Sequence, residues 1–424
     1  MDKKFDVVVI GGGTAGVIAA IQAGRANART LLVEKNVTLG GTITNAGVAF
    51  PGLFHAWTKQ IVKGIGWELV KKCVDECDLS LPDFKKQKRT NHWQQQIKIN
   101  PFIFSALCDE AIVEAGVTPL FHTMVADINN KKNYKEIQLC TKTGLKTVKS
   151  KIIIDCTGDA NVVNIAGYKV LKSENCQPAT LCCHASGYDL DEINIESLQK
   201  EFEKEVEQGN LKYTDIGWNK NSFTLHWLKT SGNNANHIYG NNMETSQGKT
   251  SLSIEGRKSL LRLFRFLKKQ PGLENLSIDY VAPECGVRET TRIKGKKKIT
   301  VDDYISGKLW EDAVCYSFYP IDLHTREKDG LDKRYLEKGV VPSIPRRAML
   351  PLNSKNIIVA GRCISSDRLA NSALRTQASC MAMGQAAGAM GALSAKTESE
   401  VSNLTMDSIY SLLEKHDAII PGTN

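Results

Sequence analysis

The sequence predicts a doubly wound α/β fold that carries an inserted α+β substrate domain. Residues 5–10 (FDVVVI) form an apolar run typical of a strand buried on both faces of a parallel sheet, and a glycine-rich turn and a helix-like segment follow. The composition changes between residues 172 and 340, where charged helical segments and aromatic residues gather. An apolar strand, NIIVAG, and a helix of small residues then follow.

These changes divide the chain into two predicted domains. We expect a discontinuous dinucleotide-binding domain formed by residues 1–171 and 341–424, and a substrate or cap domain formed by residues 172–340. Within the first domain, Asn–Pro at position 100 predicts the start of a helix that ends before Gly116. Residues 136–142 and 146–156 are expected to form neighbouring strands.

The charge of the chain is moderately basic. Its formal net charge is +9 over 424 residues. This excess predicts either solvated loops or a patch for nucleic acid or an acidic partner. No basic stripe with interleaved aromatic residues accompanies the clusters, so nucleic-acid binding gains little support. The two short clusters are Lys85, Lys86, Lys88 and Arg89, and Lys294, Lys296, Lys297 and Lys298.

The twelve cysteines lie mostly in apolar strings, with no C-x-x-C pair and no cysteine–histidine set at zinc spacing. This pattern predicts buried thiols in a reducing compartment and no metal site. The first residues do not resemble a signal peptide, because an acid and three glycines interrupt the apolar part. Residues 376–395 lack charge but are too weakly hydrophobic to insert readily into a membrane. We therefore expect a cytoplasmic protein with no membrane partner.

A dinucleotide motif lies between the first two predicted strands. Gly11, Gly13 and Gly16 fit G-x-G-x-x-G, and Glu34 follows Gly13 by 21 positions. The glycines permit the turn, the approach of a pyrophosphate and close helix packing, while the helix start attracts the phosphates. Glu34 can bind ribose hydroxyls and would repel a 2′-phosphate, so FAD or NAD fits and NADP does not. The predicted set also includes Thr14, Ala15 and Lys35.

The residues after Glu34 carry a resemblance to a family. Gly40, Gly41 and Thr42 form a Gly–Gly–Thr segment similar to that of the glutathione-reductase-type flavoproteins, which share a Rossmann-like domain. The resemblance implies FAD as the cofactor and places this segment against it. Two further segments, HTMVADI and IIIDCTGDANV, resemble strands near FAD in these proteins. They add Val125, Thr157, Gly158 and Asp159 to the predicted cofactor site.

The disulfide reductases of that superfamily are not a match. Ile43 and Val48 stand where those enzymes carry redox cysteines, so no thiolate is present there to accept electrons. A second G-x-G-x-x-G is also absent from the sequence, which argues against a separate NADPH domain.

The C-terminal segment, residues 356–393, resembles the closing motif of the fumarate-reductase-like branch and a broad family of FAD-dependent oxidoreductases. Many flavoproteins have Gly–Asp where this chain has Gly361 and Arg362, so the usual carboxylate contact to ribitol is replaced. The resemblance adds Gly361, Arg362, Arg375 and Gln377 to the cofactor site. A helix beginning near Arg375 would direct its positive dipole end at the flavin. Close packing by Ala and Gly is a second role of this helix.

Four residues are candidates for the substrate side. Arg288 and Arg292 are four positions apart, which would place both guanidinium groups on one helix face suited to an anion, or leave them in structural ion pairs. Tyr319 and His324 lie in SFYPIDLH, where an extended chain would place Asp322 beside His324. Such a carboxylate would orient the imidazole and raise its pKa for proton transfer. A histidine buried in a domain interface is the alternative.

These features predict an FAD-dependent oxidoreductase that moves a hydride between flavin N5 and a small, anionic organic substrate, with an unidentified electron donor or acceptor. A flavin-containing protein that binds or modifies RNA is an alternative, which predicts RNA affinity that falls steeply with salt. A plain NAD-dependent dehydrogenase is another, and it would lack the yellow colour of bound flavin. Substrate identity does not follow from the fold.

Overall fold

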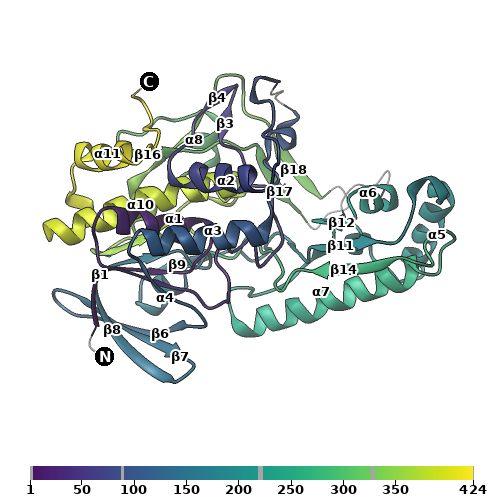
Figure 1. Cartoon of the computed structure of the whole chain (residues 1–424), viewed down its shortest axis with the longest axis horizontal. Helices are drawn as coiled ribbons and strands as arrows, with labels where there is room; N and C mark the ends of the chain where they lie inside the picture. The colour runs from purple at the N-terminus through teal and green to yellow at the C-terminus, as the bar shows by residue number, and fades with distance from the viewer. Residues whose placement is uncertain (1–2, 87–89, 218–222, 326–329, 424) are drawn as a thin grey trace.

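The computed structural model describes residues 3–86, 90–217, 223–325 and 330–423, so Lys88 and Arg89 of the first basic cluster lie outside the described residues. A seven-stranded sheet organises the larger part of the molecule (Figure 1), in the order β5-β2-β1-β8-β7-β6 with β20 also paired to β8. Its strands are β1 (Lys3–Ile10), β2 (Thr30–Val33), β5 (Thr118–Leu120), β6 (Met124–Asn130), β7 (Lys135–Thr141), β8 (Gly144–Asp155) and β20 (Ile357–Val359).

The sheet is parallel in its centre and antiparallel at one side. β5, β2, β1, β8 and β20 run parallel, whereas β7 pairs antiparallel with β8 and with β6. β8 is long enough to pair with β7 along its first half and with β20 at its end. The second half of β1, residues 7–10, and all of β2 are buried on both faces, as their apolar sequences predict. The predicted doubly wound α/β fold and the strands at residues 136–142 and 146–156 are confirmed.

Some helices pack against this sheet, and others belong to the part of the molecule beside it. The helix expected after Asn100 is confirmed, because α3 begins at Pro101 and the Asn100 side chain accepts hydrogen bonds from two backbone N–H groups of its first turn. The helices are α1 (Thr14–Arg25), α2 (Ile65–Glu76), α3 (Pro101–Glu114), α4 (Asn161–Ile165), α5 (Ile195–Glu207), α6 (Phe223–Lys229), α7 (Ser246–Leu267), α8 (Val301–Ile305), α9 (Arg368–Leu374), α10 (Gln377–Thr397) and α11 (Met406–Lys415).

The smaller part of the molecule projects to one side and has its own core (Figure 1). Buried residues between Ala179 and Cys285 form that core, while those from Ile293 onward join the core of the large sheet. The predicted domain boundaries at residues 172 and 340 stay a prediction. The short strands of the smaller part include β10 (Ala179–Thr180), β11 (Cys183–Ser186), β12 (Gly232–Asn233), β13 (His237–Ile238) and β14 (Ser277–Val281). The remaining strands are β3 (His55–Ala56), β4 (Lys59–Gln60), β9 (Val170–Lys172), β15 (Thr291–Ile293), β16 (Ala313–Tyr316), β17 (Ile321–His324), β18 (Leu331–Arg334) and β19 (Ser343–Pro345).

Two glycines bring α10 against α1. A Cβ atom on Gly384 would lie 2.2 Å from the carbonyl oxygen of Ala15, and one on Gly388 would lie 2.3 Å from that of Ala19. Neither distance is possible for real atoms, so only glycine allows this helix contact. α10 is uncharged until Lys396 because it is buried over most of its length. Among the described residues, no helix is long and apolar enough to cross a membrane.

The cysteines match the sequence prediction in their burial. All twelve carry free thiols, and nine of them are buried. Burial raises the pKa of the Cys182 and Cys183 thiols to about 12, which keeps them protonated and unreactive. Among the described residues, no group of three His, Cys, Asp or Glu side chains is arranged to hold a metal ion.

The helix contact predicts a large effect of one substitution. Gly388→Leu should lower the free energy of unfolding by about 3 kcal/mol, because the new side chain meets α1 backbone. Urea unfolding followed by circular dichroism measures this. Ala106→Leu adds a similar side chain on the exposed face of α3 and should change stability little. Equal stability of the two variants would contradict the packing argument.

Candidate cofactor and substrate site

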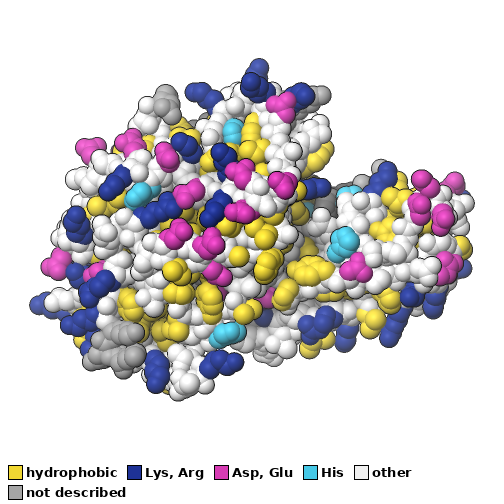
Figure 2. Space-filling model, in the orientation of Figure 1, with side chains coloured by type: hydrophobic (Ala, Val, Ile, Leu, Met, Phe, Trp, Pro, Cys, Tyr) yellow, Lys and Arg dark blue, Asp and Glu magenta, His cyan; other side chains and the backbone are white. Residues whose placement is uncertain are grey.

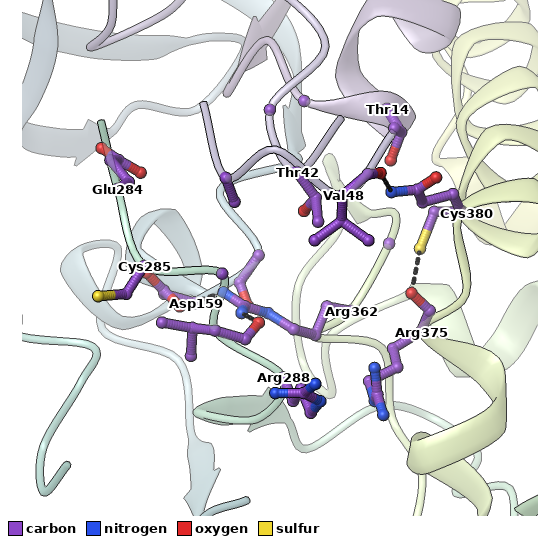
Figure 3. Close-up of a pocket in the computed structure, with 18 of the residues that line it drawn as sticks. Thr14, Thr42, Val48, Asp159, Glu284, Cys285, Arg288, Arg362, Arg375 and Cys380 are labelled. Carbon is purple, nitrogen blue, oxygen red and sulfur yellow. Dashed lines mark hydrogen bonds and ion pairs between the residues drawn. The ribbon is translucent and has the colours of Figure 1, made fainter. Parts of the chain in front are cut away.

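A large cavity opens where the parallel strands end. It has a volume of about 1170 Å³, and its wall includes the residues that follow β1, β2, β8 and β20. Ligands of open α/β sheets bind at this edge. Figure 3 shows Thr14 and Thr42 on one side of this space and Arg288, Arg362 and Arg375 on another. The lining residues from the predicted cofactor set are Gly11, Gly13, Thr14, Ala15, Glu34, Lys35, Gly41, Thr42, Val125, Thr157, Gly158, Asp159, Gly361, Arg362, Arg375 and Gln377.

The three motif glycines have different structural roles. Gly11 has φ +99°, and a Cβ there would lie 2.5 Å from the carbonyl oxygen of Cys156. A Cβ on Gly16 would overlap the carbonyl oxygen of Gly11 at 1.7 Å, and Gly16 does not line the cavity. Gly13 differs, since its backbone is extended (φ −73°) and the nearest atom to a Cβ there is 3.9 Å away, on Gly41. The protein itself therefore tolerates a side chain at Gly13, and only a ligand would exclude one.

The Gly–Gly segment packs onto this turn. Gly40 forms an isolated parallel bridge with Gly13, and its N–H donates to the carbonyl of Gly12 at 2.9 Å. A Cβ on Gly41 would lie 2.7 Å from the Cα of Gly13. Gly40 supports this contact without lining the cavity, while Gly41 and Thr42 face it.

Glu34 is held in place from two sides. Its side chain is buried and accepts hydrogen bonds from the N–H of Gly12 at 2.5 Å and from the N–H of Asn36 at 2.8 Å. A carboxylate has about four acceptor sites, so capacity remains for ribose hydroxyls. The neighbouring Lys35 forms an ion pair with Glu284, which connects this strand end to the segment before Arg288.

Arg362 ties three loops together. Its guanidinium donates to the carbonyl of Gly158 at 2.9 Å, to the Asp159 carboxylate at 2.5 Å and to the carbonyl of Val287. Burial alone would raise the pKa of Asp159, but the charges of Arg362 and Lys249 lower it. The arginine that replaces the usual aspartate therefore fixes the loop after β8 through Asp159.

The start of α10 opens into the same cavity as the start of α1. Arg375, Thr376 and Gln377 line it, and the Gln377 side-chain N–H donates to the carbonyl of Val48 at 2.8 Å. The Gln377 side-chain oxygen is buried without a hydrogen-bond partner among the described residues. A buried acceptor of this kind has an energetic cost unless a ligand satisfies it.

These features fit FAD. Gly13 leaves space that a Cβ would fill, and the starts of α1 and α10, which attract anions, both line the cavity. The Gln377 side-chain oxygen at the start of α10 has no hydrogen-bond partner among the described residues. We propose that the turn at Gly13, Glu34 and Thr42 would hold its adenosine and pyrophosphate parts, and that the α10 start at Gln377 would hold its flavin part.

A cluster of half-buried charged side chains lines part of the cavity. Arg288 donates to the carbonyl of Pro178 at 2.9 Å and to the Thr180 hydroxyl at 2.7 Å, and it lies 3.3 Å from His237 Nε2. Burial and the nearby charge of Arg375 lower the pKa of Arg288 to about 10, so it remains a cation at neutral pH. Figure 3 shows Arg288 and Arg375 next to one another.

Asp322 and His324 lie together, as the extended sequence predicts. Both belong to β17, and His324 Nε2 is 3.6 Å from the Asp322 carboxylate. The expected rise in the His324 pKa is wrong. Burial and the charge of Arg288 outweigh Asp322 and lower this pKa to about 4, so the imidazole is neutral at physiological pH. Tyr319 lines the same space, and burial raises its pKa, so the phenol keeps its proton.

Arg292 does not share a face with Arg288. The expected helix is wrong, because Arg288 lies in a loop and Arg292 lies in β15. Arg292 is buried outside the cavity wall and pairs with Glu289 at 3.1 Å. The second cavity arginine is instead Arg375, which the sequence assigned to the cofactor.

Several residues in or beside the cavity wall belong to no sequence motif. His237 reaches Arg288 because β13 pairs antiparallel with β10, opposite Thr180. His237 is not itself in the cavity wall, whereas Trp93 from a 3-10 helix, Lys98 from a loop and Lys333 from β18 line the cavity and belong to no motif. Only the long-range pairing of the folded chain brings these residues to the site. His55 is buried, stacks on Phe84 at 3.7 Å and lies outside the cavity wall.

Comparison with known proteins identifies the class of protein that this site defines. The family model of FAD dependent oxidoreductases matches residues 6–413. The chain belongs to this family, and it is an FAD-dependent oxidoreductase.

Its individual relatives are more distant. The chain is 25% identical over 201 residues to digeranylgeranylglycerophospholipid reductase of Methanocaldococcus jannaschii, an alignment that covers 47% of this chain and 48% of that protein. It is 40% identical over 81 residues to the fumarate reductase (cytochrome) of Shewanella frigidimarina, covering 19% and 12%. Dihydrolipoyl dehydrogenase of Caenorhabditis elegans is 57% identical over 45 residues, covering 11% and 9%. The chain therefore spans less than half of each of these relatives.

A solved structure is similar along most of the chain. It is the geranylgeranyl bacteriochlorophyll reductase-like protein of Thermoplasma acidophilum, with a TM-score of 0.46 and 13% identity over 98% of this chain and 84% of that protein.

The extended backbone at Gly13 generates a specific prediction. Gly13→Ala should leave the fold intact, because the added methyl group meets no protein atom closer than 3.9 Å, but should weaken FAD binding about tenfold or more. Flavin absorbance per mole of purified protein measures occupancy, and thermal unfolding measures stability. Gly16→Ala, which clashes with backbone at 1.7 Å, should instead destabilise the protein. Full flavin content in Gly13→Ala would contradict the assignment.

Proposed function

We propose that this oxidoreductase moves a hydride between flavin N5 and a small, anionic organic substrate, in the manner of the fumarate-reductase-like branch. The single observation that carries the proposal is the shared cavity. The two helix starts line it, and the half-buried side chains of Arg288 and Arg375 line it as well. A substrate held by these arginines would lie in the same enclosed space as the cofactor.

The protein contributes binding, orientation and charge. Bound FAD supplies hydride transfer, which no side chain of this chain can perform. The start of α10 lies in the cavity wall and has no side-chain cap, so the positive end of the helix dipole faces the cavity. This field stabilises negative charge that accumulates on any group bound against it.

The anion site is prepared before substrate arrives. Thr180 and the carbonyl of Pro178 hold Arg288 in one orientation, so little side-chain freedom is lost on binding. Asp322 offsets part of the charge of Arg288 and Arg375 and leaves the pair net positive. Because the single Asp322 carboxylate offsets only part of the charge of the two guanidinium groups, these groups can still bind one substrate anion.

His324 and Tyr319 are the groups that would move a proton. His324 is held by its backbone N–H, which donates to Gln177 at 3.2 Å, and by Asp322 beside its ring. A substrate anion would offset the charge of Arg288 and raise the His324 pKa toward neutrality. His324 would then exchange a proton with the substrate carbon, while Tyr319 keeps its proton and serves as a hydrogen-bond donor.

An anion titration tests the binding role of Arg288. Arg288→Lys should weaken the binding of small carboxylates about 10- to 100-fold, because the charge remains but the fork geometry is lost. Perturbation of the flavin absorbance on titration measures this dissociation constant. Arg334→Lys, on the exposed strand β18, is the matched control and should bind carboxylates normally. Unchanged affinity in Arg288→Lys would reject the anion site.

Anaerobic flavin bleaching tests the proton-transfer role. His324→Gln should keep its flavin but slow bleaching by the substrate about 100-fold or more, because the amide cannot take up a proton. A screen of small organic acids without oxygen identifies that substrate. His184→Gln changes an exposed histidine on β11 and should bleach at the normal rate. An unchanged rate in His324→Gln would remove the histidine from the mechanism.

A further inference from the structure

The long helix α7 has two faces with different surroundings. One face packs into the core of the smaller part, through Leu252, Leu263 and Leu267, which are fully or almost fully buried. Near its start, Lys249 and Leu252 also line the large cavity. The opposite face is exposed along the second half of the helix. That exposed face has no role in the site described above.

The exposed face is strongly basic. From Ser246 to Lys269, no exposed residue is acidic, because Glu255 is half-buried and pairs with Arg262 and Lys212. Within the described residues, none of the five exposed cations of this stretch forms an ion pair with a carboxylate. We name this surface the α7 basic face, and its residues are Ile254, Arg257, Lys258, Leu261, Arg265, Lys268 and Lys269.

Two large aliphatic side chains project among these cations. Ile254 is 44% exposed and Leu261 is 46% exposed. They are seven positions apart, which places them on the same side of the helix. Figure 2 shows the result along the lower edge of the smaller part, where Lys and Arg side chains alternate with hydrophobic ones. Cations flanking exposed aliphatic groups are typical of helices that lie on membrane surfaces.

We propose that the α7 basic face docks on the surface of an anionic lipid bilayer. The five cations match the negative headgroups, and Ile254 and Leu261 would enter the boundary between headgroups and acyl chains. RNA fits this face less well, because the exposed residues offer no aromatic ring for base stacking and the two aliphatic groups would be left between phosphates. This surface contact goes beyond the proposed function and does not depend on it.

The position of α7 gives the docking a consequence for the cavity. The same helix that would contact the lipid has its other face against the cavity at Lys249 and Leu252. A helix with its side chains is about 10 Å in diameter. The docked protein would therefore hold its cavity within about one helix diameter of the headgroups near the start of α7.

Vesicle co-sedimentation of the flavin-loaded protein tests the proposal. The protein should sediment with vesicles of phosphatidylcholine mixed with phosphatidylglycerol, should release at high salt and should ignore vesicles of phosphatidylcholine alone. Arg257→Gln with Lys258→Gln should lower the partition coefficient about 30-fold at low salt. Ile254→Ser with Leu261→Ser should weaken binding at high and low salt alike, because the loss is apolar.

The matched control removes two charges elsewhere. Lys296→Gln with Lys298→Gln changes exposed lysines in the segment before α8, on the larger part, and should bind anionic vesicles like the unaltered protein. The proposal is wrong if the unaltered protein does not sediment with anionic vesicles at low salt. It is also wrong if the control loses binding equally, or if single-stranded RNA is bound and vesicles are not. Flavin content and circular dichroism confirm that each variant is folded.

Discussion

The contact between α10 and α1 is the constraint on which the site depends. Gly384 and Gly388 let the two helices approach until backbone meets backbone, and any side chain there would separate them. This approach sets the distance between the two helix starts, which share one cavity at the ends of the parallel strands. The positive dipole ends of both helices therefore act on a single bound molecule, and the glycine turn at Gly13 leaves space for it.

Electrostatics divides the cavity into two regions. Near the glycine turns, the Arg362 guanidinium donates to the Asp159 carboxylate and to backbone carbonyls, so it links loops structurally. Beside the start of α10, Arg288 and Arg375 are both near the Asp322 carboxylate and together keep a net positive charge. The same residue type therefore serves as a tie in one region and as an anion site in the other, and the number of acceptors around each guanidinium decides which.

Most of the residues that the sequence assigned to the cofactor line one cavity, whereas the substrate-side prediction for Arg292 is wrong. The motif from Gly11 to Glu34 is local, so its spacing alone indicates a strand, a turn and a helix. Arg288 and Arg292 could not be placed this way, because their spacing was interpreted as helical while the chain there is a loop and a short strand. The lowered pKa of His324 could not be predicted from the sequence either, since it depends on burial and on Arg288, which is distant in the sequence.

The order of the elements along the chain has a consequence for biosynthesis. α1 ends at Arg25 and α10 begins only at Gln377, yet each forms part of the same cavity wall. Contacts between segments so far apart form slowly, because a long loop must close first. A chain that is still being synthesised can thus form the β1–α1–β2 unit early, but it lacks the cavity wall that α10 supplies until α10 has been made. A chain without α10 would therefore lack one wall of the cavity, so complete cofactor binding requires that α10 has been made and has packed against α1.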